Sequence, residues 1–116
     1  MSNSGSTSGL CRLSGDSTLP SQTLLVTNEL ASTSIAVHAV RYRDVQRPSP
    51  VLGPGAQFHA CTRDMDLMVV AVTITAVNGS APGLPYHTML GYPTAGERSV
   101  AFEIRVTSNG VHLLNV

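Results

Sequence analysis

The amino-acid sequence predicts a mainly β fold: one antiparallel β domain in the form of a curved sheet, a barrel or a sandwich. Apolar and polar residues alternate along several segments, and an Asn-Gly pair joins the last two of them. No segment of useful length repeats its apolar residues with the 3.6-residue period of an amphipathic helix. At 116 residues, the chain is long enough for one domain with a buried core but too short for two.

The composition predicts an aliphatic core and a surface with few charges. Hydrophobic residues make up 42% of the chain, but aromatic residues only 4%, and there is no Trp. Charged residues account for 12%, about half the usual share, and the net charge is zero. A nucleic-acid-binding protein would need a basic stripe, so this class is excluded. Since few charges keep the molecules apart, we expect a homo-oligomer or other self-association.

The first 22 residues are rich in Ser, Gly and Thr and predict a disordered tail, followed by an antiparallel β domain over residues 23–116. We find neither the basic and apolar pattern of a signal peptide nor an apolar run of about 18–20 residues that could span a membrane. The sequence therefore predicts a cytoplasmic protein. In that compartment Cys11 and Cys61 are expected as free thiols, with a disulfide between them as the alternative.

Strands are expected in order along the domain. Residues 23–29, 34–42 and 56–63 read as strands, whereas three prolines and two glycines make residues 44–55 a loop. Residues 67–77 predict the central strand, because their density of β-branched side chains favours a strand over a helix. Its buried face is expected to consist of Met68, Val70, Val72 and Ile74.

The clearest local pattern is a hairpin over residues 99–116. Apolar side chains occupy every second position of its first strand, and Asn109-Gly110 fits the two positive-φ positions of a type I′ turn. This turn places Val106 opposite Leu113 and Thr107 opposite His112. We expect the apolar face of the central strand to pack against the face formed by Val100, Phe102, Ile104 and Val106.

Catalytic and metal-binding motifs are scarce. The four histidines are scattered one per element, so their spacing predicts no metal site. His59 and Cys61 share a strand face, but residues two apart are neighbours in any strand, and a structural cysteine is the expected interpretation. Glu97 beside Arg98 is expected to form a surface ion pair. We therefore expect no cofactor, and the sequence leaves open whether the chain is an enzyme.

The stretch YHTMLGYPTAGE, residues 86–97, carries a resemblance to a known family. Residues 83–97 resemble the Tyr-Gly-Thr-Leu-x-Gly-His-Pro-x-x-Gly-Glu signature of an uncharacterised bacterial and plant family of START-like (helix-grip) type. The matching positions are Gly83, Tyr86, Thr88, Gly91, Pro93, Gly96 and Glu97. The resemblance extends over about residues 55–116 and implies a curved sheet around an apolar cavity. Residues 24–63 are more weakly similar in strand rhythm to aegerolysin-type β-sandwiches, which act at membrane surfaces.

The START-like resemblance leads to a functional hypothesis of small, apolar ligand binding without catalysis. In this hypothesis Tyr86, His87 and Glu97 are the polar contacts at the cavity rim, and Glu97 orients the ligand or, as a lesser alternative, acts as a general base. Ligand contacts to the apolar wall would come from Met68, Val70 and Phe102. The alternative is a structural, self-assembling β-sandwich interaction protein whose sheets pack shut.

Overall fold

The computed structural model describes residues 18–43, 48–94 and 96–115. They form eight strands and one short 3₁₀ turn, with no α-helix among them. Correspondingly, no helix of the described residues is long and apolar enough to cross a membrane. The elements in order are β1 (Gln22–Asn28), β2 (Ile35–Arg41), β3 (Val51–Leu52), β4 (Gln57–Thr62), η2 (Met65–Leu67), β5 (Val69–Ala76), β6 (Tyr86–Met89), β7 (Val100–Thr107) and β8 (Gly110–Asn115).

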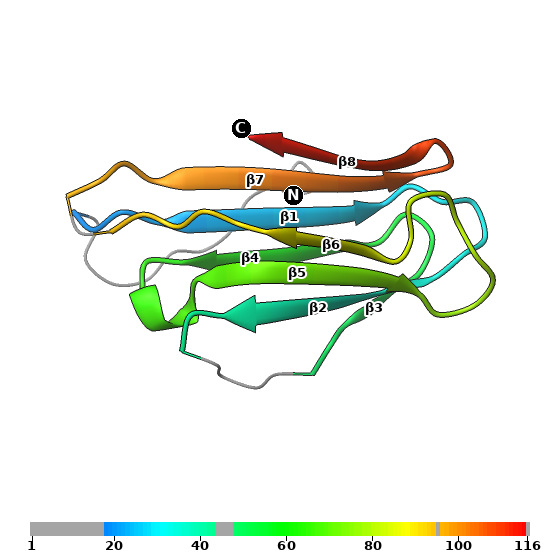
Figure 1. The fold of residues 1–116 in the computed structure, drawn as a ribbon, viewed down its shortest axis with the longest axis horizontal. Helices are drawn as coiled ribbons and strands as arrows, with labels where there is room; N and C mark the ends of the chain where they lie inside the picture. Colours follow the sequence, from blue (N-terminus) through cyan, green and yellow to red (C-terminus); the bar gives the residue numbers. More distant parts are fainter. Residues whose placement is uncertain (1–17, 44–47, 95, 116) are drawn as a thin grey trace, which may run out of the picture.

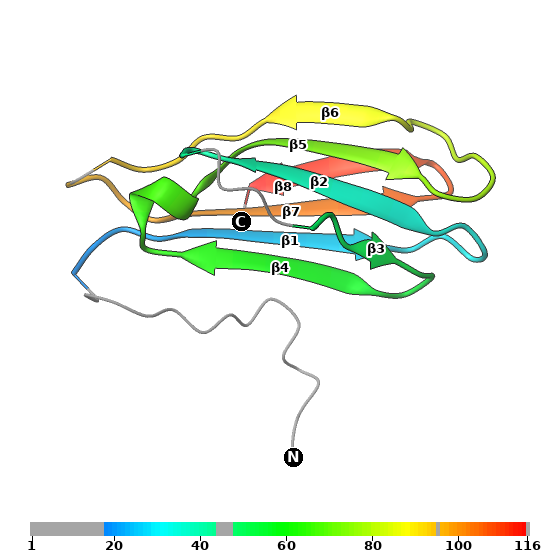
Figure 2. The ribbon, with the colours of Figure 1, turned by 90° about the horizontal axis from the view of Figure 1, so that it is seen from below.

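The strands form two four-stranded sheets that lie on one another as a sandwich (Figure 2). The order is β4-β1-β7-β8 in the first sheet and β3-β2-β5-β6 in the second. The prediction of a mainly β domain is confirmed, and the sandwich is the architecture found. Paired strands run antiparallel, except that β1 and β7 are parallel.

The fold differs from the helix-grip arrangement that the START-like resemblance implies. A helix-grip domain needs a helix against its curved sheet, and the described residues contain none. The inner face of the first sheet instead packs on a second sheet (Figure 2). The START-like resemblance is therefore wrong.

Aliphatic side chains from both sheets form one core. In β1 every second residue points inward, which places Leu24 and Val26 in the core with exposed fractions of 1% and 0%. Each such buried side chain contributes about 1.5–3 kcal/mol. As expected from the sequence, residues of β5 and β7 share this core. Its buried members are Leu24, Val26, Leu30, Ile35, Val37, Leu52, Val69, Val72, Ile74, Leu90, Ile104 and Val106.

A β-bulge shifts the alternation at the start of β5. Val40 pairs with Ala71, but the next residue, Arg41, pairs with Val69, so Val70 is an extra residue on β5. The expected inner face is therefore correct at Val72 and wrong at Val70, which is half-buried while Val69 occupies the core. The pattern of the sequence carries no sign of this extra residue.

The predicted hairpin is confirmed, but its register is not. Thr107 pairs with Gly110 and Val106 with Val111, so Ser108 and Asn109 form the loop. The Thr107 hydroxyl accepts a hydrogen bond from the Asn109 N–H at 3.1 Å and donates one to the Gly110 carbonyl at 3.1 Å. Because the slip is two residues, each side chain stays on the face that the sequence predicts.

The two sheets are offset, so β8 lies at an open edge. In Figure 1, β7 and β8 extend beyond β6, the nearest strand of the second sheet. Leu113 and Leu114 of β8 are 38% and 42% exposed. Unpaired backbone groups along such an edge are available to another strand.

Candidate functional site

The six residues predicted to contact a ligand lie at different depths in the sandwich. Met68 is fully buried, and Val70 is half-buried beside the bulge. Tyr86 and Phe102 pack against the core from β6 and β7. His87 and Glu97 are exposed. Their assignment as ligand contacts stays a prediction.

The polar members of this set do not converge. Tyr86 and His87 are neighbours in β6, so they point to opposite faces of the second sheet. Tyr86 packs on the core, whereas His87 Nδ1 lies 2.8 Å from the Thr73 hydroxyl. Glu97 accepts hydrogen bonds from the Thr94 N–H and the Thr94 hydroxyl, and thus closes its own loop. The structure brings together only Tyr86 and Phe102, as two aromatic side chains on one core.

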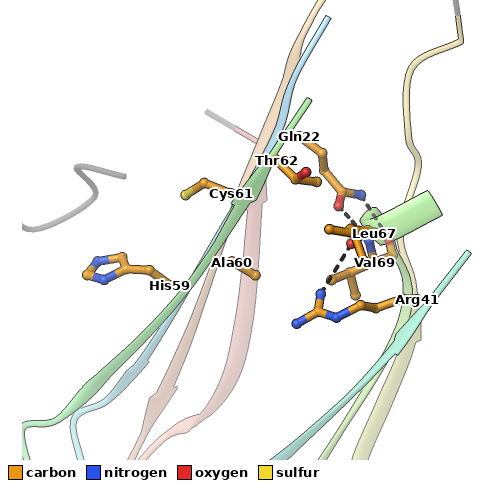
Figure 3. A pocket seen from close by; sticks show the side chains of 8 residues that line it. All are labelled: Gln22, Arg41, His59, Ala60, Cys61, Thr62, Leu67 and Val69. Atoms are coloured by element: carbon orange, nitrogen blue, oxygen red, sulfur yellow. Dashed lines mark hydrogen bonds between the residues drawn. The ribbon is translucent and has the colours of Figure 1, made fainter. Parts of the chain in front are cut away.

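A pocket of about 300 Å³ lies at one end of the sandwich, between β4 and β2 (Figure 3). None of the six predicted residues lines it. It is a candidate site because it combines a cationic side chain, an amide and a hydroxyl. Its lining residues are Gln22, Arg41, His59, Ala60, Cys61, Thr62, Leu67 and Val69.

Gln22 is the most deeply buried polar side chain of this pocket, with 1% of its surface exposed. Its Nε2 donates to the carbonyl oxygens of Val69 at 2.8 Å and Gly91 at 3.0 Å, and its Oε1 accepts from the Val69 N–H at 2.7 Å. The amide thus joins β1 of the first sheet to β5 and to the loop after β6. Its hydrogen-bonding groups are engaged in holding the sheets together, which is a structural role.

The remaining polar groups of the pocket point in different directions. Arg41 lies between the sheets, and its Nη1 donates to the Leu67 carbonyl at 3.2 Å. Figure 3 shows His59 and Cys61 on the other side of β4, away from Arg41. Cys61 is disulfide-bonded, so the expectation of a free thiol is wrong there, while Cys11 lies outside the described residues. A disulfide sulfur is not a thiolate, so Cys61 and His59 do not form a nucleophile pair.

Asn28 is the counterpart of Gln22 at the opposite end of β1. It is fully buried, and its Nδ2 donates to the carbonyl oxygens of Thr33 at 2.9 Å and Leu52 at 3.0 Å. Its Oδ1 accepts from the Leu30 N–H at 3.0 Å. Sequence reasoning missed both amides. The available signal was that Gln22 and Asn28 stand in phase with Leu24 and Val26 on the inward side of one strand.

Charged groups are found on the surface. Glu29 and Arg105 form an ion pair, with 2.5 Å between Oε2 and Nε. The hydrogen bond from Arg105 lowers the pKa of the Glu29 carboxyl, and the positive charge adds to this effect. Among the described residues, no group of three or more His, Cys, Asp or Glu side chains could hold a metal ion.

Comparison with known proteins identifies structural relatives only. No protein-family model and no curated protein sequence matches the chain. The crystal structure of the T6SS lipoprotein TssJ1 from Pseudomonas aeruginosa superimposes with a TM-score of 0.52, at 12% sequence identity, over 84% of this chain and 97% of that one. This chain has a TssJ1-like fold. Serratia marcescens Lip, a membrane-bound component of the Type VI secretion system, gives a TM-score of 0.48 at 10% identity, over 82% and 97% of the two chains.

The TssJ1-like fold corrects three expectations from the sequence. The structural relative is a two-sheet lipoprotein rather than a START-like domain, and the described residues lack the helix of the latter. The hypothesis of an apolar ligand inside a curved sheet is wrong, because side chains of both sheets fill the space between them. The expected cytoplasmic location is also wrong, since it conflicts with the lipoprotein likeness and with the disulfide at Cys61.

Proposed function

We propose that this chain is a structural β-sandwich domain that acts by binding other protein molecules, including copies of itself. The observation that carries the proposal is the closed core between the two sheets, to which β1, β2, β5 and β7 all contribute. The two buried amides, Gln22 and Asn28, are hydrogen-bonded to the main chain and support rigidity rather than chemistry. The TssJ1-like fold agrees with this role, because TssJ1 is a lipoprotein of a secretion system.

The disulfide at Cys61 supports an oxidising compartment outside the cytoplasm. Disulfides persist in secreted and periplasmic proteins and are rare where thiols are kept reduced. The lipoprotein character of TssJ1 supports the same location. We therefore assign the domain to an assembly of the cell envelope.

Self-association is supported by the low charge and by the exposed apolar side chains. Only 12% of the residues are charged, with no net charge, so electrostatic repulsion between copies is weak. Large apolar side chains that are 48–68% exposed include Val40, Tyr42, Val51, Val77 and Met89. Such side chains lose unfavourable contact with water when another protein covers them.

Sedimentation velocity over a concentration series of the purified full chain tests the proposal. We expect the weight-average mass to rise with concentration through the micromolar range, in the oxidised protein and without added ligand. A strict monomer at tens of micromolar would contradict the self-associating role.

A further inference from the structure

The outer face of the second sheet has no charged side chain. The register of β2, β3, β5 and β6 identifies which residues point away from the core. The first sheet differs, because its outer face carries Glu103 and Arg105. We call the uncharged surface the neutral face; its residues are Ala36, His38, Val40, Val51, Ala71, Thr73, Thr75, His87 and Met89.

Two rows of side chains cross the neutral face from β2 over β5 to β6. In the first row, Val40 pairs with Ala71, which pairs with Met89. Ala71 is only 7% exposed between Val40 at 48% and Met89 at 68%. The small central side chain thus leaves a shallow depression between two exposed apolar side chains.

The second row consists of His38, Thr73 and His87. His87 Nδ1 lies 2.8 Å from the Thr73 hydroxyl, and His38 Nδ1 lies 2.6 Å from the Ser49 hydroxyl. These bonds use one nitrogen of each imidazole, and the other, Nε2, is able to donate or accept a hydrogen bond. The row therefore offers both kinds of hydrogen-bonding group without a fixed charge on the flanking residues.

We propose that the neutral face is the interface between two copies of this chain, an inference that rests on the proposed self-association. A face without charge has nothing to pair with a charged partner, an anionic lipid surface or a nucleic acid. It is complementary to itself, because apolar side chains meet apolar ones and each imidazole can donate to or accept from another. Two-fold symmetry requires this property of an isologous interface.

A two-fold axis along β5 gives this interface a definite set of contacts. It places β2 of one copy opposite β6 of the other while β5 meets β5. Val40 then contacts Met89 of the second copy, and His38 meets His87 of the second copy. Each contact occurs twice in the dimer.

The size of the neutral face predicts weak binding. Four strands about 4.8 Å apart and about seven residues long, at about 3.3 Å per residue, cover roughly 23 by 19 Å. This area is well below the about 800 Å² per partner that a stable complex of standard size buries. We therefore expect a dissociation constant in the micromolar range.

Single charges placed on the neutral face test the proposal by sedimentation velocity, with circular dichroism to verify folding. Met89→Glu and Val40→Arg each put a charge opposite an apolar residue of the second copy, and each is expected to weaken dimerisation by about tenfold or more. Leu114→Glu is the matched control. It adds the same charge at a residue of similar exposure on β8, opposite Glu103 on the first sheet, and should leave the dimer within about twofold of wild type.

Mixing the two single variants gives the sharpest result. In a mixed dimer the new carboxylate meets the new guanidinium once, and the wild-type pair Val40 and Met89 meets once. We expect the equimolar mixture to dimerise more tightly than either variant alone. No gain on mixing, or weakening by Leu114→Glu but not by Met89→Glu, overturns the assignment of the face while the proposed self-association stands. A wild-type chain that stays monomeric contradicts both.

Discussion

Gln22 and Val69 exchange two hydrogen bonds across the sandwich, although they are 47 residues apart in the sequence. The Gln22 side chain donates to the Val69 carbonyl and accepts from the Val69 N–H, as a neighbouring strand would. The amide thereby satisfies main-chain groups next to the bulge of β5. Such groups would otherwise be buried without partners, which is costly.

Replacement of Gln22 by Met should destabilise the domain, because it keeps the side-chain volume but removes the amide. Leaving buried polar groups unpaired costs about 1–3 kcal/mol each, so we expect a loss of about 2 kcal/mol or more. Urea denaturation measures the change. Gln57→Met is the control, since Gln57 is exposed and makes only a 3.4 Å bond to Thr27. Equal effects of the two substitutions would show that the inter-sheet amide has no special weight.

Ile74→Ala and Ile104→Ala should each cost about 2–5 kcal/mol, because both side chains are fully buried in the shared core. Val77→Ala, at a side chain that is 54% exposed, should stay within about 0.5 kcal/mol of wild type. Chemical denaturation of the three variants checks the packing of β5 on β7. Losses under about 1 kcal/mol at both isoleucines would place them outside the core.

Local features of the fold were accessible from the sequence, whereas long-range ones were not. Alternation predicts strands, and the Asn109-Gly110 pair predicts a hairpin, because both depend on neighbouring residues. The parallel pairing of β1 with β7 joins segments that are far apart in the chain, and no local pattern specifies it. The bulge at Val70 shifted the inner face for the same reason, since it is defined only by the partner strand β2.

The site hypothesis failed where a motif was interpreted as a cluster. Residues 86–97 gather several polar side chains in sequence, but β6 sends Tyr86 inward and His87 outward. The polar groups that organise the interior, Gln22 and Asn28, come instead from one strand with an ordinary apolar pattern. Their inward phase was visible in the sequence, but their partners on the second sheet were not.

The stability of the domain should depend on pH through Glu29. Arg105 lowers the pKa of this carboxyl in the folded state, so the ionised form stabilises the fold. The stabilisation is present above the pKa of an unfolded glutamate and is lost as the pH falls through the lower, folded pKa. Unfolding free energies of wild type and Glu29→Gln should therefore converge towards acidic pH. High salt should reduce the difference at neutral pH, because the pair is exposed; a difference that grows on acidification would contradict the pairing.

The disulfide at Cys61 should protect this residue from alkylation until a reductant is added. Peptide mapping of the unreduced, alkylated protein is expected to find no modified Cys61, and reduction before alkylation should expose it. The reduced protein should also unfold at a lower denaturant concentration, because a native cross-link restricts the unfolded chain. Alkylation of Cys61 in the untreated protein would remove the support for an oxidising compartment.

Native mass spectrometry of the freshly purified, oxidised chain tests the central claim most directly, because one spectrum reports the number of subunits and any retained small molecule. A structural sandwich with a closed core predicts a dimer or larger assembly at the mass of the polypeptide alone. Tyr86→Phe and Glu97→Gln should leave that spectrum unchanged. A monomer that carries a stoichiometric small molecule, released by either substitution, would contradict the account.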